Sequence, residues 1–230
     1  MPDDLTGAEE VLRQHQTIGM ATSARRPGSW NATAEERAMR AAACDWAVMR
    51  WPGCKVMTEV PVGQARIDVL VLTPDQIIGI ELKSSADTLT RLPAQLDEYL
   101  GCIPEVWLAM APKWWRAVTS QPIAQSKLEL PFRVGRLTYE DGVLRETHPT
   151  ASGMEMARPA IMNPMVTSGA LHLLWRDELL AIAQAHGIKV RSRATVLDVC
   201  GQLARSLTGD QIIARVSEAI AARPESKKAP

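Results

Sequence analysis

Residues 66–83 read RIDVLVLTPDQIIGIELK and carry the strongest structural signal in the chain. Two apolar runs flank a Thr-Pro-Asp turn, which is the pattern of two buried strands joined by a tight connection. Asp68 lies inside the first run, and Glu81 ends the second. An ionised carboxylate among apolar side chains carries a desolvation cost of several kcal/mol. The two acids therefore require a cation or a polar site.

Lys83 follows Glu81 by two residues, so the two side chains share one face of a strand. If the two strands pair, Asp68 reaches that face as well. A divalent cation such as Mg²⁺ or Mn²⁺ suits this arrangement, because it binds one or two carboxylates plus water and phosphate. We expect Asp68, Glu81 and the backbone carbonyl of Leu82 to bind the metal. Lys83 would position the attacking water or stabilise the oxyanion.

A helix is expected over residues 84–101, directly after these strands. Arg91, Gln95 and Tyr99 are spaced by four residues, so one helical face presents all three. The alternative is an ordinary solvent-exposed helix face. For Asp68, Glu81 and Lys83 the corresponding alternative is a structural ion pair at a sheet edge.

The order Asp68, then Glu81-Leu82-Lys83, resembles the D…ExK signature of the PD-(D/E)xK nuclease superfamily. Gln95 and Tyr99 are similar to the QxxxY element of its RecB-like members, which lies beside the metal site and binds DNA or orders the site. The segment also resembles small bacterial DNA repair proteins of the MmcB type, over about residues 33–112. The resemblance implies a restriction-endonuclease-like fold with catalytic Asp68, Glu81 and Lys83, supported by Gln95, Tyr99 and Arg91.

Thr33 is expected to cap a helix over residues 33–50, with Glu36 completing a capping box. Met39, Ala42, Trp46 and Met49 recur at helical spacing and should face the core. Many members of the nuclease superfamily carry a further acidic ligand on this helix. The resemblance therefore makes Glu35 or Glu36 a candidate metal ligand, with helix capping as the competing role.

We predict an α/β fold with a restriction-endonuclease-like mixed sheet of four or five strands, flanked by helices and followed by a small helical C-terminal unit. Asp141-Gly142 should connect a second hairpin, between 133–140 and 143–147. The expected organisation is an N-terminal arm (1–32), a nuclease-like core (33–148), a linker (149–169), a helical unit (170–223) and a polar tail (224–230).

The C-terminal unit should contain helices over 171–185, 195–207 and 210–222, with a basic loop between the first two. Lys189, Arg191 and Arg193 in this loop could meet a phosphate backbone. The segment is similar to small helix-loop-helix DNA-binding units of the SAP kind. A helical lid with a solvated basic loop is the alternative.

Composition and the cysteine pattern narrow the classes of protein and of metal site that the chain could represent. The chain has 26 basic and 26 acidic residues, which argues against coating nucleic acid through bulk charge. None of the four cysteines forms a CxxC pair, so a structural zinc site is not expected. The N-terminus resembles no signal peptide, and no apolar run is long enough to span a membrane. We expect a cytoplasmic protein encoded by a bacterium or phage; the sequence leaves the oligomeric state open, a homodimer included.

The function expected from the sequence is metal-dependent hydrolysis of DNA phosphodiesters, in DNA repair or in the processing of phage and mobile-element DNA. The main alternative is a non-catalytic DNA-binding repair accessory protein with the same fold. A third class is a protein-interaction module that keeps the ion pairs as structure.

Overall fold

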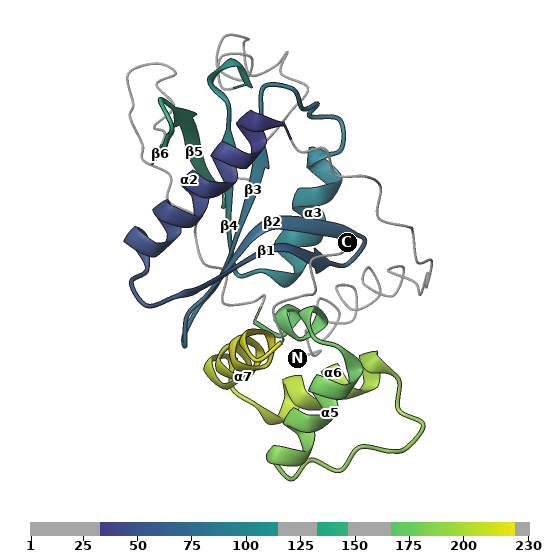
Figure 1. Cartoon of the computed structure of the whole chain (residues 1–230). Coiled ribbons are helices and arrows are strands. Elements are labelled where there is room, and N and C mark those ends of the chain that lie inside the picture. The colour runs from purple at the N-terminus through teal and green to yellow at the C-terminus, as the bar shows by residue number, and fades with distance from the viewer. Residues whose placement is uncertain (1–32, 115–132, 147–166, 224–230) are drawn as a thin grey trace, which may run out of the picture. The chain divides into compact units, whose positions relative to one another are not determined.

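The computed structural model describes residues 33–114, 133–146 and 167–223, and its sheet has the strand order β1-β2-β3-β4-β5-β6 (Figure 1). The strands are β1 (Lys55–Val62), β2 (Ala65–Leu72), β3 (Ile77–Lys83), β4 (Glu105–Met110), β5 (Gly135–Glu140) and β6 (Val143–Glu146). Strands β3, β4 and β5 pair in parallel, and the other neighbours are antiparallel. The mixed α/β architecture is as predicted, but four or five strands was too few.

The additional strands come from the second hairpin, which joins the same sheet. Trp107 of β4 pairs with Gly135 of β5. The predicted turn connects β5 to β6, and Asp141 and Gly142 have φ angles of 52° and 82°. Two successive left-handed residues are typical of a two-residue hairpin turn, which explains Asp-Gly at this position.

Helix α2 (Ala34–Arg50) packs on one face of the sheet through Met39, Ala42, Ala43, Trp46 and Ala47. The ring of Trp46 meets that of Trp107 edge-on, with centroids 5.0 Å apart. The prediction that Met49 faces the core was wrong, because 70% of its surface is exposed in the last turn of the helix. Thr33 caps the helix as expected by accepting from the backbone N–H of Glu36 at 3.1 Å.

Helix α3 (Leu92–Cys102) packs on the opposite face through Leu92, Leu96 and Tyr99. It begins eight residues later than the predicted start at residue 84. The carboxylate of Asp87 accepts from both the backbone N–H and the hydroxyl of Ser84 at 2.7 Å, which stabilises a turn in place of a helical start. Pro93 in the first helical turn then sets the start, because proline is tolerated only there.

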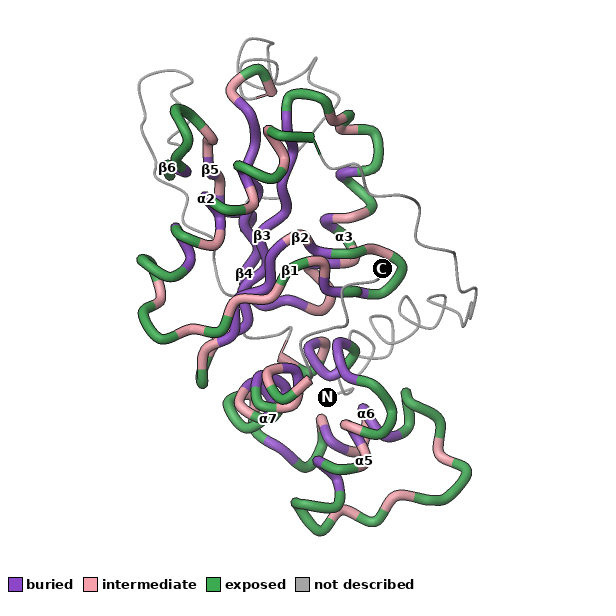
Figure 2. The backbone as a smooth tube through the Cα atoms, viewed as in Figure 1, coloured by how far each residue is buried: buried purple, intermediate pink, exposed green. Residues whose placement is uncertain are grey.

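The C-terminal helices are η2 (Gly169–Leu173), α5 (Arg176–Ala185), α6 (Val196–Ser206) and α7 (Gly209–Ala221). The expected helical character is confirmed, but the single helix predicted over 171–185 is divided into η2 and α5. Their buried side chains belong to one apolar cluster with residues of β1, β2, α3 and β4. Figure 2 shows this burial along the described trace. Among the described helices, none is long and apolar enough to cross a membrane.

Several predicted segments lie outside the described residues. They are the N-terminal arm (1–32), most of the linker (149–166) and the polar tail (224–230).

Candidate functional site

Strands β2 and β3 separate at the predicted site. Their ladder of pairs runs from Leu72↔Ile77 to Val69↔Ile80 and ends there. Beyond it the backbone N–H of Leu82 donates to Oδ2 of Asp68 at 2.8 Å. Where the two strands separate, the Asp68 carboxylate thus accepts the hydrogen bond that a backbone carbonyl of β2 would accept in a continuous ladder.

The alternation of side chains along β2 is interrupted at the same point. Ile67 and Leu70 both belong to the apolar cluster beneath α3, whereas Val69 packs beneath α2. On the neighbouring strand β1, Glu59 has a φ angle of 58°, a left-handed conformation that is rare for a non-glycine residue. The local distortion lets the Asp68 carboxylate approach α2 as well as β3.

The α3 side of the site is a closed network around Glu81. The Lys83 ammonium lies 2.5 Å from Oε1 of Glu81 and donates to the Gln95 carbonyl oxygen at 3.0 Å. The Gln95 amide nitrogen donates to Oε1 of Glu81 at 2.9 Å. Only 2% of Glu81 and 7% of Lys83 is exposed, so the network is shielded from solvent.

Tyr99 connects this network to β2. Its hydroxyl lies 2.9 Å from Oε2 of Glu81 and 2.6 Å from the backbone carbonyl of Arg66. Burial, with the nearby charge of Glu81, raises the pKa of Tyr99 well above its ordinary value, so the hydroxyl keeps its proton. The expected pairing of Gln95 and Tyr99 beside Glu81 and Lys83 is therefore seen in the structure.

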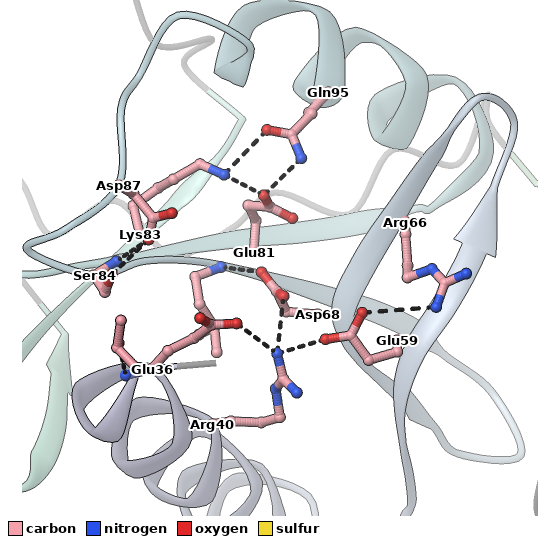
Figure 3. A network of polar contacts seen from close by, with 12 residues as sticks. Glu36, Arg40, Glu59, Arg66, Asp68, Glu81, Lys83, Ser84, Asp87 and Gln95 are labelled. Atoms are coloured by element: carbon pink, nitrogen blue, oxygen red, sulfur yellow. Dashed lines mark hydrogen bonds and ion pairs between the residues drawn. The ribbon is translucent and has the colours of Figure 1, made fainter. Parts of the chain in front are cut away.

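The α2 side of the site is a second network, centred on Arg40 (Figure 3). The Nη2 atom of Arg40 lies 3.1 Å from Glu36, 2.5 Å from Glu59 and 3.6 Å from Asp68. Between 18% and 24% of each of these four side chains is exposed, in contrast to the closed α3 side. Asp68 also accepts from the backbone N–H of Leu82, the residue next to Glu81 in β3.

The electrostatics favour a cation near Asp68. Burial, followed by the charge of Glu81, raises the pKa of Asp68 to about 8, despite the hydrogen bond from Leu82 and the charge of Lys83. Burial also raises the pKa of Glu59, although Arg40 and Arg66 oppose this shift. A buried carboxylate whose pKa is raised by desolvation is stabilised in its charged form by a nearby positive charge.

The structure distinguishes the two acids at the start of α2. Glu36 pairs with Arg40 beside Asp68, so its carboxylate faces the site and does not complete the expected capping box. Glu35 instead accepts from the backbone N–H of Ser85 at 2.9 Å and holds the loop after Lys83. Trp114 holds the same loop, since its indole donates to the carbonyl of Ser84 at 2.8 Å.

The other predicted residues lie outside these networks. Arg91 is exposed at the residue that precedes α3, one turn before Gln95. Lys189, Arg191 and Arg193 are exposed in the loop between α5 and α6. In the described part of the chain, the structure brings none of these four into contact with Asp68, Glu81 or Lys83.

Arg40 was not predicted from the sequence. Its position four residues after Glu36, on the same helical face, was the available signal. Glu59 could be recognised as a nearby acid, but its register with Asp68 depends on the β1–β2 pairing. That pairing places Thr58 opposite Val69 and Val60 opposite Ile67, which brings Glu59 to Asp68.

The donor set fits a hard divalent cation. Asp68 and Glu81 supply carboxylate oxygens, which Mg²⁺ and Mn²⁺ prefer, and the Asp68 carboxyl is destabilised when charged without a cation. Among the described residues, no three His, Cys, Asp or Glu side chains are arranged around one metal position. Magnesium is commonly held by only one or two carboxylates, with water molecules as its other ligands. Asp68 and Glu81 would be enough for such a site.

Comparison with known sequences shows a similarity to a phage protein family. Residues 31–128, less than half of the chain, match the family described as Bacteriophage P4 protein cII. No curated protein and no solved structure matches the chain. The segment that is similar to the phage family contains both networks, from Glu36 on α2 to Tyr99 on α3.

Proposed function

We propose that the chain is a divalent-metal-dependent nuclease that hydrolyses DNA phosphodiester bonds. The observation that carries the proposal is the position of Asp68, which accepts from the N–H of Leu82 where β2 and β3 separate. Leu82 lies between Glu81 and Lys83, whose side chains pair at 2.5 Å. The resemblance to the PD-(D/E)xK superfamily supports the same assignment, because it rests on these residues.

The contacts support the following roles. Asp68, Glu81 and the carbonyl of Leu82 would hold the metal, and Glu36 is the candidate for a further ligand. A metal held there would supply an activated water and positive charge for the developing oxyanion. Lys83 would add positive charge next to Glu81, and Gln95 fixes both Lys83 and Glu81 through its two amide atoms.

The difference in exposure between the two networks suggests the direction of substrate approach. Glu81 and Lys83 are almost fully buried, whereas Asp68, Glu36, Arg40 and Glu59 are each about one fifth exposed. We therefore place the phosphodiester on the α2 side, above Asp68. In this arrangement Gln95 and Tyr99 of α3 serve as a rigid support that fixes Glu81 and Lys83.

DNA is the substrate class that the resemblance implies, and similarity to a phage family favours the processing of phage or mobile-element DNA. The exposed Lys189, Arg191 and Arg193, together with Arg91, are the candidate contacts to the phosphate backbone. Their contribution would appear as salt-dependent affinity for DNA, independent of the cleavage step.

A second candidate, a non-catalytic DNA-binding protein with the same fold, is favoured by one observation. The Arg40 guanidinium lies among Glu36, Glu59 and Asp68 and supplies positive charge there without a metal. A chain that uses arginine as the permanent cation of the site would bind DNA and leave it intact.

Cleavage of supercoiled plasmid and linear DNA, with Mg²⁺, Mn²⁺ or EDTA, separates the two candidates. We expect the parent to cut only with metal, and Lys83→Ala to lose at least about a hundredfold in rate, the usual contribution of a positioned proton-transfer or charge-stabilising group. Lys55→Ala is the control, because it also removes one lysine charge. Lys55 is exposed and donates to the carbonyl of Ala221, outside the two networks. DNA binding without cleavage in the parent would favour the second candidate, and equal activity of Lys83→Ala would contradict the assigned role.

A further inference from the structure

Arg40 is held in an unusual way. One nitrogen, Nη2, is the contact atom to Glu36, Glu59 and Asp68, at 3.1, 2.5 and 3.6 Å. The Nε atom of the same guanidinium is buried and has no hydrogen-bond partner among the described residues. A guanidinium at a permanent structural site usually forms parallel bonds through two nitrogens. The Arg40 head is thus incompletely satisfied where it lies.

The three contacts differ in length. Glu36 and Glu59 lie 3.1 and 2.5 Å from Nη2 of Arg40, whereas Asp68, at 3.6 Å, is the most distant of the three partners. Another nearby cation, Lys83, lies 2.5 Å from Glu81. Arg40 is thus a cation within 4 Å of Asp68, and its contact with Asp68 is the longest of the three.

A metal ion and a guanidinium that share one carboxylate repel each other. A divalent ion at Asp68 would lie within a few ångströms of Arg40, where this repulsion is large in a partly buried site. The ion therefore binds only at the expense of the contact between Arg40 and Asp68. Glu36 and Glu59 can retain the arginine head once that contact is lost.

We infer that Arg40 is the resident counter-ion of Asp68 in the metal-free chain and that it sets the metal affinity of the site by competing with the divalent ion. The inference rests on the proposed function for the metal position at Asp68 and Glu81. Arg40 is a positioning residue in this scheme, because it acts through Asp68.

Calorimetric titration of the full chain with Mn²⁺, in the absence of DNA, tests this directly. Arg40→Gln removes the competing charge, so we expect it to bind Mn²⁺ about tenfold tighter or more than the parent. Arg40→Lys keeps the charge and should stay close to the parent. Arg66→Gln is the matched control, because it removes a guanidinium that lies 3.9 Å from Glu59, the residue that also pairs with Arg40.

The outcomes separate this inference from the proposed function. Unchanged or weaker binding by Arg40→Gln, with a parent that binds Mn²⁺, overturns the inference and leaves the nuclease proposal standing. Binding by Arg40→Gln but not by the parent supports the inference and contradicts metal-dependent catalysis by the parent. No binding by either folded protein overturns both.

A measurement on the parent covers the case in which Arg40→Gln fails to fold. Mg²⁺ is titrated while the guanidinium ¹⁵N signals of the arginines are recorded, with Arg40→Lys used to assign the Arg40 signal. We expect the Arg40 signal to shift with the same dissociation constant as metal binding. An Arg40 signal that does not respond while the metal binds would overturn the inference.

Discussion

At the residue scale, Asp68 has opposing influences on its charge. Burial, Glu81 and Glu59 disfavour the carboxylate, whereas the Leu82 N–H and Lys83 favour it. The first group prevails, so the pKa of Asp68 rises to about 8 in the metal-free protein. A carboxyl with a raised pKa in the folded state destabilises that state once it ionises. The residue therefore lowers stability at a position where a bound cation would restore it.

This imbalance predicts how Asp68→Asn changes stability with pH. The parent should lose free energy of unfolding, relative to Asp68→Asn, as pH rises from about 4, the unfolded pKa, to about 8, the folded pKa. The difference should reach a few kcal/mol at its largest and stay constant at higher pH. Asparagine keeps an oxygen that can accept from Leu82. Urea unfolding in EDTA at pH 5 and pH 9 measures the difference.

Asp97→Asn is the control for this experiment, because Asp97 is an exposed residue of α3. The pH dependence measured for Asp68→Asn is compared with that of this variant. A constant or shrinking difference between Asp68→Asn and the parent would show that the Asp68 carboxylate is not destabilised in the folded chain.

Individual site residues could be predicted where local pattern determines their position. Glu81 and Lys83 lie on the same strand face because of the two-residue period, and Gln95 and Tyr99 share a helical face. For Arg40 only the pairing with Glu36 has such a local signal, because Glu59 and Asp68 come from β1 and β2. Such contacts depend on how a helix is placed over a sheet.

At the element scale, α3 orders the site from one face of the sheet. Gln95 accepts from Lys83 and donates to Glu81, and Tyr99 holds the carbonyl of Arg66 next to the separated strands. A helix was expected in this region, but its start could not be predicted. The Ser84–Asp87 turn competes with helix formation, and its hydrogen bonds become visible only in the folded chain.

Gln95→Ala tests this ordering role. Loss of the amide leaves Glu81 and Lys83 without their shared partner, and residues that orient metal ligands contribute about 10- to 100-fold to metal affinity or activity. We expect Gln95→Ala to lower Mn²⁺ affinity and cleavage rate within this range while the fold is retained. Gln64→Ala, in the exposed β1–β2 turn, should behave like the parent. Equal values for both variants would assign α3 a purely structural role.

At the scale of the whole molecule, one apolar cluster contains side chains of the sheet, of α3 and of the C-terminal helices. The sequence showed the helices as amphipathic segments, but it could not show what their apolar faces contact. The six-stranded sheet was missed for the same reason. Both strands of the Asp141-Gly142 hairpin could be recognised, whereas the pairing of β5 with β4 is a long-range contact.

The shared cluster predicts that the described elements unfold together. Leu171 of η2 is fully buried, and Leu171→Ala should lower the free energy of unfolding by about 2–5 kcal/mol. The transitions followed by helix content and by tryptophan fluorescence should shift equally, as in a two-state system. Leu197→Ala is the control, because 52% of Leu197 is exposed. A helical transition that moves alone would show that the C-terminal helices are an independent domain.

The central claim is that Asp68 and Glu81 hold a divalent cation where β2 and β3 part. Crystals grown with Mn²⁺ and measured at the manganese absorption edge test it directly, since the anomalous signal locates the ion without any assumption about activity. The account predicts a peak about 2 Å from carboxylate oxygens of both residues. Crystals of the folded protein in which Mn²⁺ occupies other positions, or none, would contradict it.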